Sequence, residues 1–169
     1  MIVSKYIETT GGPTICASSK DLLVWNGIRK ERDQSPSDYD LACSNDDELW
    51  VMNRTCGGLY MIMGQEPFPS MFWTMADGKR CGICRSYAEE PFVFNNAAVE
   101  VSQQISMCDV RVSISEGPVV LFDSASIGKK INFNSLPNLD LPWPIRRATG
   151  WHYSHNIYGN EVLVEFFPE

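Results

Sequence analysis

Three runs of strand-forming residues in this chain are each interrupted by a glycine pair or a Gly-Pro step and then resume. These runs are residues 6–16, broken at Gly11-Gly12-Pro13, residues 49–63, broken at Gly57-Gly58, and residues 110–122, broken at Gly117-Pro118. Glycine adopts the positive backbone angles that tight turns need, so each unit is predicted to be a β-hairpin or a bent pair of strands. The pattern predicts a mostly β protein built from antiparallel sheets.

The clear helix signals lie before residue 48, and residues 95–104 are ambiguous between helix and strand. Residues 18–25 offer a serine N-cap followed by an apolar run, with Gly27 as a stop, and residues 37–43 follow Pro36. Serine at the N-cap and proline at the first helical turn favour helix initiation. One or two short helices near the N-terminus are therefore predicted.

The second half of the chain carries further strand and turn signals. Asp77-Gly78 predicts a two-residue hairpin turn, and residues 131–133 alternate as a strand would. Three prolines make residues 134–144 a connection at a sheet edge. A last hairpin is predicted across Tyr158-Gly159-Asn160.

A chain of 169 residues suits one domain, residues 1–169, or two small halves, 1–92 and 93–169, that share a core. A weak internal repeat favours two related β subdomains, because segments 49–90 and 110–167 both run strand, glycine turn, strand, connection and a basic pair before another strand. No apolar run approaches the roughly 20 residues that span a bilayer, and the N-terminus lacks a signal-peptide pattern. We therefore expect a cytoplasmic protein with no membrane partner.

The net charge of −7 is concentrated in one window, residues 31–48, which holds a single arginine among its acidic residues. Such a segment is either a solvated linker or a recognition surface, since clustered carboxylates steer and orient a cationic protein. Nucleic acid is disfavoured as a ligand because binding it requires a basic surface. The candidate partner-binding residues are Asp38, Asp40, Asp46, Asp47 and Glu48, together with Gln65 and Glu66 from a rigid proline-containing loop.

The clearest candidate for chemistry is Cys81-Gly82-Ile83-Cys84, because Cys-x-x-Cys pairs form redox couples and halves of zinc sites. Here the pair follows a hairpin turn inside a strand-like run, where residues three apart point to opposite faces. The other four cysteines are isolated, so no second pair completes a zinc site. Structural thiols are the favoured interpretation, with metal binding and redox chemistry as alternatives.

Other catalytic patterns are missing from the sequence. His152 and His155 lack the spacing of a zinc-protease pair, and no nucleophile elbow, phosphate-binding loop or dinucleotide fingerprint occurs. Glu89-Glu90 are neighbours whose side chains diverge, and Asp123 is predicted to cap a turn at a strand end. No catalytic residue, metal or cofactor is therefore predicted.

Several of these motifs resemble the immunity protein 21 family of bacterial polymorphic toxin systems. The resemblance rests on Glu8-Thr9-Thr10-Gly11-Gly12-Pro13, on Trp25-Asn26-Gly27 and on Ser37-Asp38-Tyr39-Asp40-Leu41-Ala42-Cys43. Gly57-Gly58 and Gly64-Gln65-Glu66-Pro67-Phe68-Pro69 are similar to that family's glycine pair, strand and Gly-Asp-Glu-Pro stretch, with Gln65 in place of the aspartate. The resemblance covers residues 6–90 and beyond 110 is limited to Gly117 to Asp123.

The resemblance implies a mostly β, cytoplasmic protein that binds a cognate toxin and blocks it, with no catalysis and no cofactor. A basic nuclease is the leading class of toxin, because nucleases are often basic. The acidic segment is then expected to meet the toxin, with the turn at Gly11-Gly12-Pro13 and the loop at Gln65-Glu66-Pro67 holding neighbouring contacts. The alternatives are a small thiol- or metal-dependent enzyme and a structural β adaptor domain; no oligomeric state is predicted.

Overall fold

The computed structural model describes residues 2–28, 35–53, 58–64, 69–86, 106–115, 117–155 and 159–168. Its strands form two antiparallel sheets, sheet A in the order β1-β5-β6-β11-β10-β7 and sheet B in the order β3-β4-β2-β8-β9. Sheet A consists of β1 (Ile2–Ile7), β5 (Ser70–Thr74), β6 (Cys81–Ser86), β7 (Ser106–Ile114), β10 (Ile145–His155) and β11 (Gly159–Phe167). Sheet B consists of β2 (Thr14–Ser18), β3 (Leu49–Asn53), β4 (Leu59–Met63), β8 (Gly117–Asp123) and β9 (Asn138–Leu141). The predicted mostly β fold with antiparallel sheets is confirmed.

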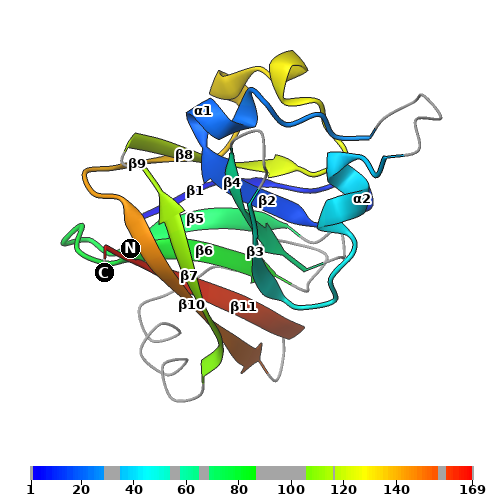
Figure 1. The fold of residues 1–169 in the computed structure, drawn as a ribbon. Helices are drawn as coiled ribbons and strands as arrows, with labels where there is room; N and C mark the ends of the chain where they lie inside the picture. Colours follow the sequence, from blue (N-terminus) through cyan, green and yellow to red (C-terminus); the bar gives the residue numbers. More distant parts are fainter. Residues whose placement is uncertain are drawn as a thin grey trace.

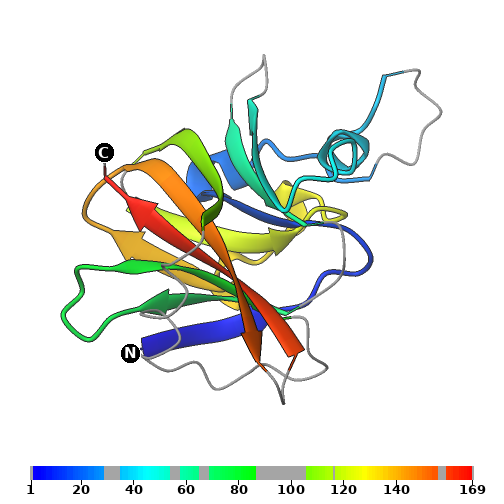
Figure 2. The same cartoon turned by 90° about the horizontal axis from the view of Figure 1, so that it is seen from below.

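The two sheets pack face to face, and a third layer covers the far side of sheet B (Figures 1 and 2). The core between the sheets contains side chains from both, for example Met61 and Leu121 from sheet B and Phe72 and Val164 from sheet A. A second core lies on the opposite face of sheet B, beneath the helices and the segment that follows β8. Because side chains alternate along a strand, β2 and β8 contribute to both cores, and all of β2 and the last five residues of β8 are buried.

Two short α-helices occur before residue 48, as predicted. Helix α1 (Ser19–Leu22) begins after the N-cap Ser18, whose hydroxyl accepts a hydrogen bond from the backbone of Asp21. Helix α2 (Asp38–Ala42) begins after Ser37 with a reciprocal capping box between Ser37 and Asp40. Helix α1 is shorter than the sequence suggests, because turns replace the helix after Leu22 and bring Trp25 onto the face of sheet B.

Three predicted hairpins are confirmed. Strands β3 and β4 pair from Leu49↔Met63 to Asn53↔Leu59. Strands β5 and β6 pair from Ser70↔Arg85 to Thr74↔Cys81, but residues 75–80, with Gly78 at φ +69°, join them, so the connection is longer than the predicted two-residue turn. Strands β10 and β11 pair over nine positions, from Arg147↔Phe167 to His155↔Gly159. In each case the partner strand is the next one along the chain.

The other two glycine units are corners between the sheets and not hairpins. At Gly11-Gly12-Pro13 the chain passes from β1 in sheet A to β2 in sheet B. Before Gly117-Pro118 it likewise passes from sheet A to sheet B, from β7 to β8. The physical reason is burial: all five residues of β2 are buried, whereas β1 is an edge strand with an exposed surface. A strand buried on both faces needs two neighbours of its own sheet, and β2 finds them in β4 and β8.

The segment between β8 and β10 lies at a sheet edge, as predicted, but its secondary structure differs from the prediction. Residues 138–141, predicted as part of a connection, form β9, a four-residue edge strand of sheet B that pairs with β8. Residues 131–133 do not form a strand, because two 3₁₀ turns, η1 (Gly128–Lys130) and η2 (Phe133–Ser135), occupy this stretch. The apolar residues of the pattern cover the second core instead.

Each sheet combines strands from before residue 92 and after residue 93. In sheet A, β6 pairs with β11, and in sheet B, β2 pairs with β8. The separation into one domain or two related halves stays a prediction. Among the described residues, no helix has the length and apolar character that crossing a lipid bilayer requires.

Candidate functional site

The short motifs that stand out in the sequence meet at one end of sheet B. Four segments, residues 9–13, 25–28, 37–43 and 123–126, are joined there by hydrogen bonds, and we call this cluster the α2 corner. Figure 1 shows α2 at the side of the molecule, between the turn that follows β1 and the segment that leads to β3. The α2 corner holds the described part of the acidic segment in place.

Asp123, at the end of β8, ties the N-terminal glycine turn to sheet B. One carboxylate oxygen accepts hydrogen bonds from the backbone N–H of Thr10 at 3.1 Å and from its hydroxyl at 2.6 Å. The other accepts from the backbone N–H of Ala125 at 3.0 Å, which confirms the predicted turn cap. Gly12 lies against α2 so closely that a Cβ there would be 2.6 Å from the ring of Tyr39. Glycine is therefore required at position 12 for close approach.

Trp25 and Gly27 connect α1 to the same cluster. The indole of Trp25 is fully buried between Tyr60 and Phe122, at ring-centroid distances of 4.8 and 5.6 Å, and donates a hydrogen bond from Nε1 to the carbonyl of Ser124 at 2.9 Å. Gly27 has φ +59° and lies against the backbone of Ser126. Both contacts fix the segment that leads from α1 towards α2.

Of the predicted partner-binding residues that the structure describes, Asp38 is the buried one. Its side chain is 3% exposed and accepts a hydrogen bond from the backbone N–H of Asn26 at 2.7 Å. It also lies in the first turn of α2, where a carboxylate complements the free N–H groups. In this position Asp38 fastens α2 to the Trp25–Gly27 segment.

Asp40 is exposed and completes the capping box of α2. Its Oδ2 accepts hydrogen bonds from the backbone N–H and the hydroxyl of Ser37, at 2.8 and 2.7 Å. These bonds lower the pKa of Asp40. Because bonding to the charged form is what lowers the pKa, Asp40 keeps its negative charge further into the acidic range than an ordinary aspartate.

Tyr39 joins α2 to the glycine turn. Its hydroxyl donates a hydrogen bond to the carbonyl of Gly11 at 3.0 Å. The pKa of Tyr39 is raised, first by its interaction with the Cys43 thiol, then by burial and by the negative charges of Asp123 and Asp40. The phenol therefore stays protonated and able to donate. The sequence did not indicate this contact, because nothing local relates Tyr39 to a turn 28 residues away.

The segment after α2 carries the remaining acidic residues towards β3. Asp46 and Asp47 are exposed, and Glu48 is half-buried, with its Oε2 3.9 Å from Nη1 of the buried Arg85. The backbone carbonyl of Glu48 accepts a hydrogen bond from the N–H of Gly64 at 3.0 Å. Gly64 directly precedes Gln65 and Glu66, the two loop residues predicted to contact the partner. The hydrogen bond to Glu48 therefore places the residue before them beside the acidic segment.

Part of the predicted site lies outside the described residues. This holds for Gln65 and Glu66, for Glu89-Glu90, and for the acidic residues before Ser35. The strand β10 contains His152 and His155, but their side chains are outside the description. In the described part of the chain, no three His, Cys, Asp or Glu side chains gather as metal ligands would.

Cys81 and Cys84 lie on strand β6, as predicted, and both are 1% exposed. Cys81 faces the core between the sheets, and three residues along a strand place Cys84 on the other face. Burial raises the pKa of the Cys81 thiol to about 12, with a further contribution from Glu165. A thiol of that pKa is protonated at neutral pH, whereas the thiolate is the form that attacks disulfides and binds metals.

We expect that replacing Cys81 and Cys84 with serine removes stability and leaves partner binding intact. Each change places a hydroxyl in an apolar site, so the free energy of unfolding should fall by about 1–3 kcal/mol per site. Urea unfolding measures this loss, and metal analysis of protein purified without added metal supplies the control. Stoichiometric zinc in the wild-type protein, lost in the double variant, would contradict the structural interpretation.

Comparison with known proteins gives one family. Residues 5–146 match the family described as immunity protein 21, and the matched range contains all four segments of the α2 corner. Neither a curated protein nor a solved structure matches the chain.

Proposed function

The chain belongs to the immunity protein 21 family, and on this ground we propose that it binds a cognate bacterial toxin and neutralises it without catalysis. The family match over residues 5–146 carries the proposal. In this function the protein acts as a rigid inhibitor in the cytoplasm, with a protein partner and with no metal, cofactor, nucleic acid or membrane requirement. A basic nuclease is the proposed class of toxin.

The proposed contact surface is the acidic segment that the α2 corner positions. Among its described residues, Asp40, Asp46 and Asp47 are exposed and Glu48 is half-buried. Gln65 and Glu66 are proposed as further contacts. Asp38 contributes by holding α2 in place through its bond to Asn26. Charges at the rim of an interface act mainly on the association rate, because they attract an oppositely charged partner before contact is made.

We expect the double variant Asp46→Asn/Asp47→Asn to associate more slowly with the toxin encoded by the neighbouring gene. Both side chains are exposed, so the fold should be unchanged. The association rate constant should fall by about 3- to 10-fold at low salt and approach the wild-type value at about 0.5 M salt, where charges are screened over a few ångströms. Stopped-flow or surface-based kinetics at several salt concentrations measures this.

A matched control separates a local effect from one of net charge. Asp77→Lys changes the net charge by the same two units, in the exposed turn between β5 and β6, far along the chain from α2. We expect the association rate constant of Asp77→Lys to fall much less than that of the double variant. If the double variant associates at the wild-type rate at low and moderate salt, and also protects cells that express the toxin, the acidic segment is only a solvated face.

A further inference from the structure

A groove of about 360 Å³ lies on the outer side of the layer that covers sheet B. Its apolar lining comes from α1 and the residue after it, from the start of β8, and from the 3₁₀ segment, and Lys20 stands at its edge. The apolar lining residues are Leu22, Leu23, Pro118, Ile131 and Phe133. The volume is at the lower end of the range for ligand-binding pockets and suits one or two side chains better than a cofactor.

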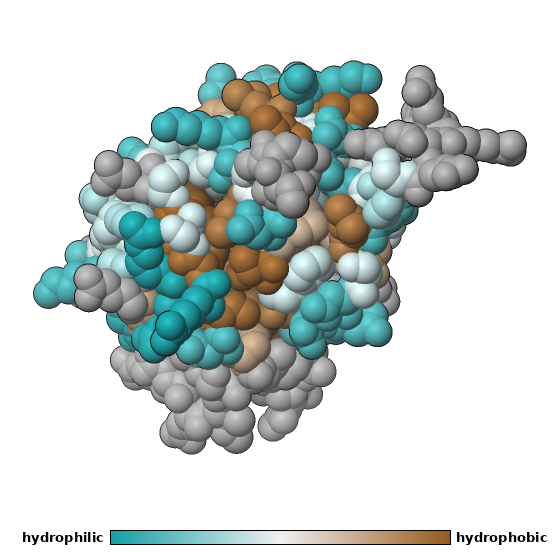
Figure 3. Space-filling model, in the orientation of Figure 1, coloured by the Kyte–Doolittle hydropathy of each residue, from teal (hydrophilic) through white to brown (hydrophobic). Residues whose placement is uncertain are grey.

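The floor of this groove is rigid and its wall is exposed. Leu22 is 1% exposed and belongs to the second core, against which Ile131 and Phe133 also pack. Leu23, by contrast, is 54% exposed. Figure 3 shows apolar side chains at the top of the molecule, over α1 and the segment that follows β8, with hydrophilic residues around them. An apolar surface on a rigid floor, rimmed by polar residues, is typical of a site that meets another protein.

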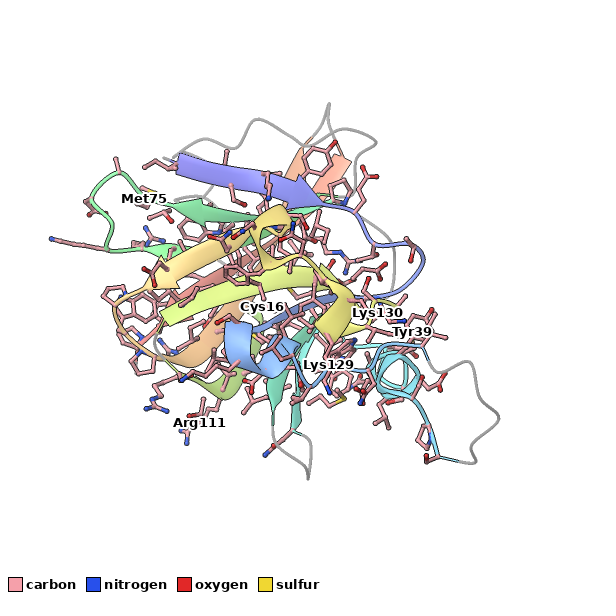
Figure 4. The ribbon with its side chains drawn as sticks, turned by 90° about the horizontal axis from the view of Figure 1, so that it is seen from above. Cys16, Tyr39, Met75, Arg111, Lys129 and Lys130 are labelled. Carbon is pink, nitrogen blue, oxygen red and sulfur yellow. The ribbon has the colours of Figure 1, made fainter. Side chains whose placement is uncertain are left out.

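In a chain whose net charge is negative, lysines lie on or next to the elements that line the groove. Lys20 lines it, and Lys129 and Lys130 follow Gly128, which lies so close to α1 that a Cβ there would be 1.7 Å from the carbonyl oxygen of Leu22. Figure 4 shows Lys129 and Lys130 on the segment beside α1. Lys5 reaches the same segment, donating from Nζ to the carbonyl of Asn134 at 3.0 Å.

Two carboxylates lie near the groove. Asp21 of α1 accepts a hydrogen bond from the hydroxyl of Ser18 at 2.9 Å, and the exposed Asp140 pairs with Pro118 across the β8–β9 ladder. Lys20, Lys129 and Lys130 outnumber these carboxylates, so an excess of positive charge remains at the groove's edge. The groove is thus apolar at its floor and basic at its rim, opposite in charge to the acidic segment.

We propose that this groove binds an apolar side chain of the toxin that is flanked by aspartate or glutamate. The inference rests on the proposed function and adds a second, chemically different contact to it. The lysine rim complements carboxylates, and the apolar floor gains free energy from the buried side chain. Desolvated apolar contacts govern mainly the dissociation rate, whereas the acidic segment governs the association rate. The two surfaces therefore have separate kinetic signatures.

The test uses the toxin encoded by the neighbouring gene and two groove variants. Leu23→Asp places a carboxylate on the exposed wall without touching the buried floor, and Lys129→Glu/Lys130→Glu reverses the charge of the rim. We expect Leu23→Asp to raise the dissociation rate constant by about tenfold or more and the lysine variant by about threefold or more, with smaller changes in association. Val24→Asp and Lys79→Glu are the controls: Val24 is exposed and does not line the groove, and Lys79 is exposed in the turn between β5 and β6 of sheet A, outside the elements that line it.

The outcomes separate this inference from the proposed function. If wild-type protein binds the toxin and Leu23→Asp dissociates at the wild-type rate, the groove inference is wrong and the proposed function stands. If wild-type protein does not bind the toxin at all, the proposed function itself fails. If the groove instead holds a second copy of the chain, Leu23→Asp would change the mass measured by sedimentation equilibrium and leave the dissociation rate constant of the toxin complex unchanged. This result too would overturn the inference.

Discussion

Gly27→Ala is expected to destabilise the protein by at least about 3–4 kcal/mol, close to the largest effects that single substitutions produce. Gly27 has φ +59°, where an L-residue costs about 1–2 kcal/mol. A Cβ would in addition lie 2.3 Å from the carbonyl oxygen of Ser126 and 2.6 Å from that of Ala125. Both obstacles are backbone atoms, and the Ala125 carbonyl accepts a hydrogen bond from Ile28. Relief of the clash therefore requires the α2 corner to open.

Gly78→Ala is the matched control for this prediction. Gly78 has a similar backbone angle, φ +69°, but no atom lies within 4 Å of the position that a Cβ would take. We expect Gly78→Ala to lower the free energy of unfolding only by the cost of placing an L-residue at positive φ, about 1–2 kcal/mol. Urea unfolding of both variants isolates the steric contribution at Gly27. Equal losses would mean that the Ser126 backbone moves freely, and that the α2 corner is not the rigid support we describe.

The sequence predicted structure well where the decisive contacts are local. The hairpins β3–β4, β5–β6 and β10–β11 pair neighbouring strands, and the caps at Ser18 and Ser37 act on residues three positions away. In each case the pattern and its physical effect lie within one short stretch. Local propensity and turn chemistry are then sufficient.

The glycine corners show what cannot be predicted from neighbouring residues alone. Gly11-Gly12-Pro13 reverses the chain, but whether β1 pairs with β2 depends on strands β4 and β8, which belong to other parts of the sequence. The hydrogen bonds that hold this turn involve distant residues: Thr10 donates to Asp123, 113 residues away, and Tyr39 donates to the carbonyl of Gly11, 28 residues away. A glycine pair predicts a change of direction, and long-range burial decides which sheet the next strand joins.

The candidate site was predictable in composition but not in arrangement. The acidic cluster predicted the same partner-binding role for Asp38 and Asp46. In the structure Asp38 is buried and accepts a hydrogen bond from a backbone N–H, whereas Asp46 is exposed. The groove beside α1 carried no sequence signal, because Leu23 and Phe133 are 110 positions apart and appear as ordinary apolar residues. Their contribution to a surface arises only when α1 and the 3₁₀ segment pack on sheet B.

The second large effect is expected at a buried ion pair in sheet A. Arg80 meets Glu165 of β11 with both ends of its guanidinium, Nε to Oε1 at 2.6 Å and Nη2 to Oε2 at 2.9 Å. Glu165 is 3% exposed, while the side chain of Arg80 is 31% exposed. Arg80→Met leaves a carboxylate buried without its cation, which costs about 3–5 kcal/mol in a fully buried pair. Because Arg80 is partly in water, we expect the lower end, about 3 kcal/mol.

A double-mutant cycle tests the origin of that loss. Arg80→Met/Glu165→Leu removes both charges, and apolar replacements of buried ion pairs are often neutral or stabilising, so most of the loss should be recovered. The ion pair lies on sheet A, whereas α2 and the groove belong to sheet B and the layer that covers it, so the double variant should bind the toxin with wild-type kinetics. Unfolding in urea and toxin-binding rates are measured on the same preparations. If the double variant is as unstable as the sum of the two single variants, the uncompensated charge is not the cause, and packing around Arg80 must supply the stability instead.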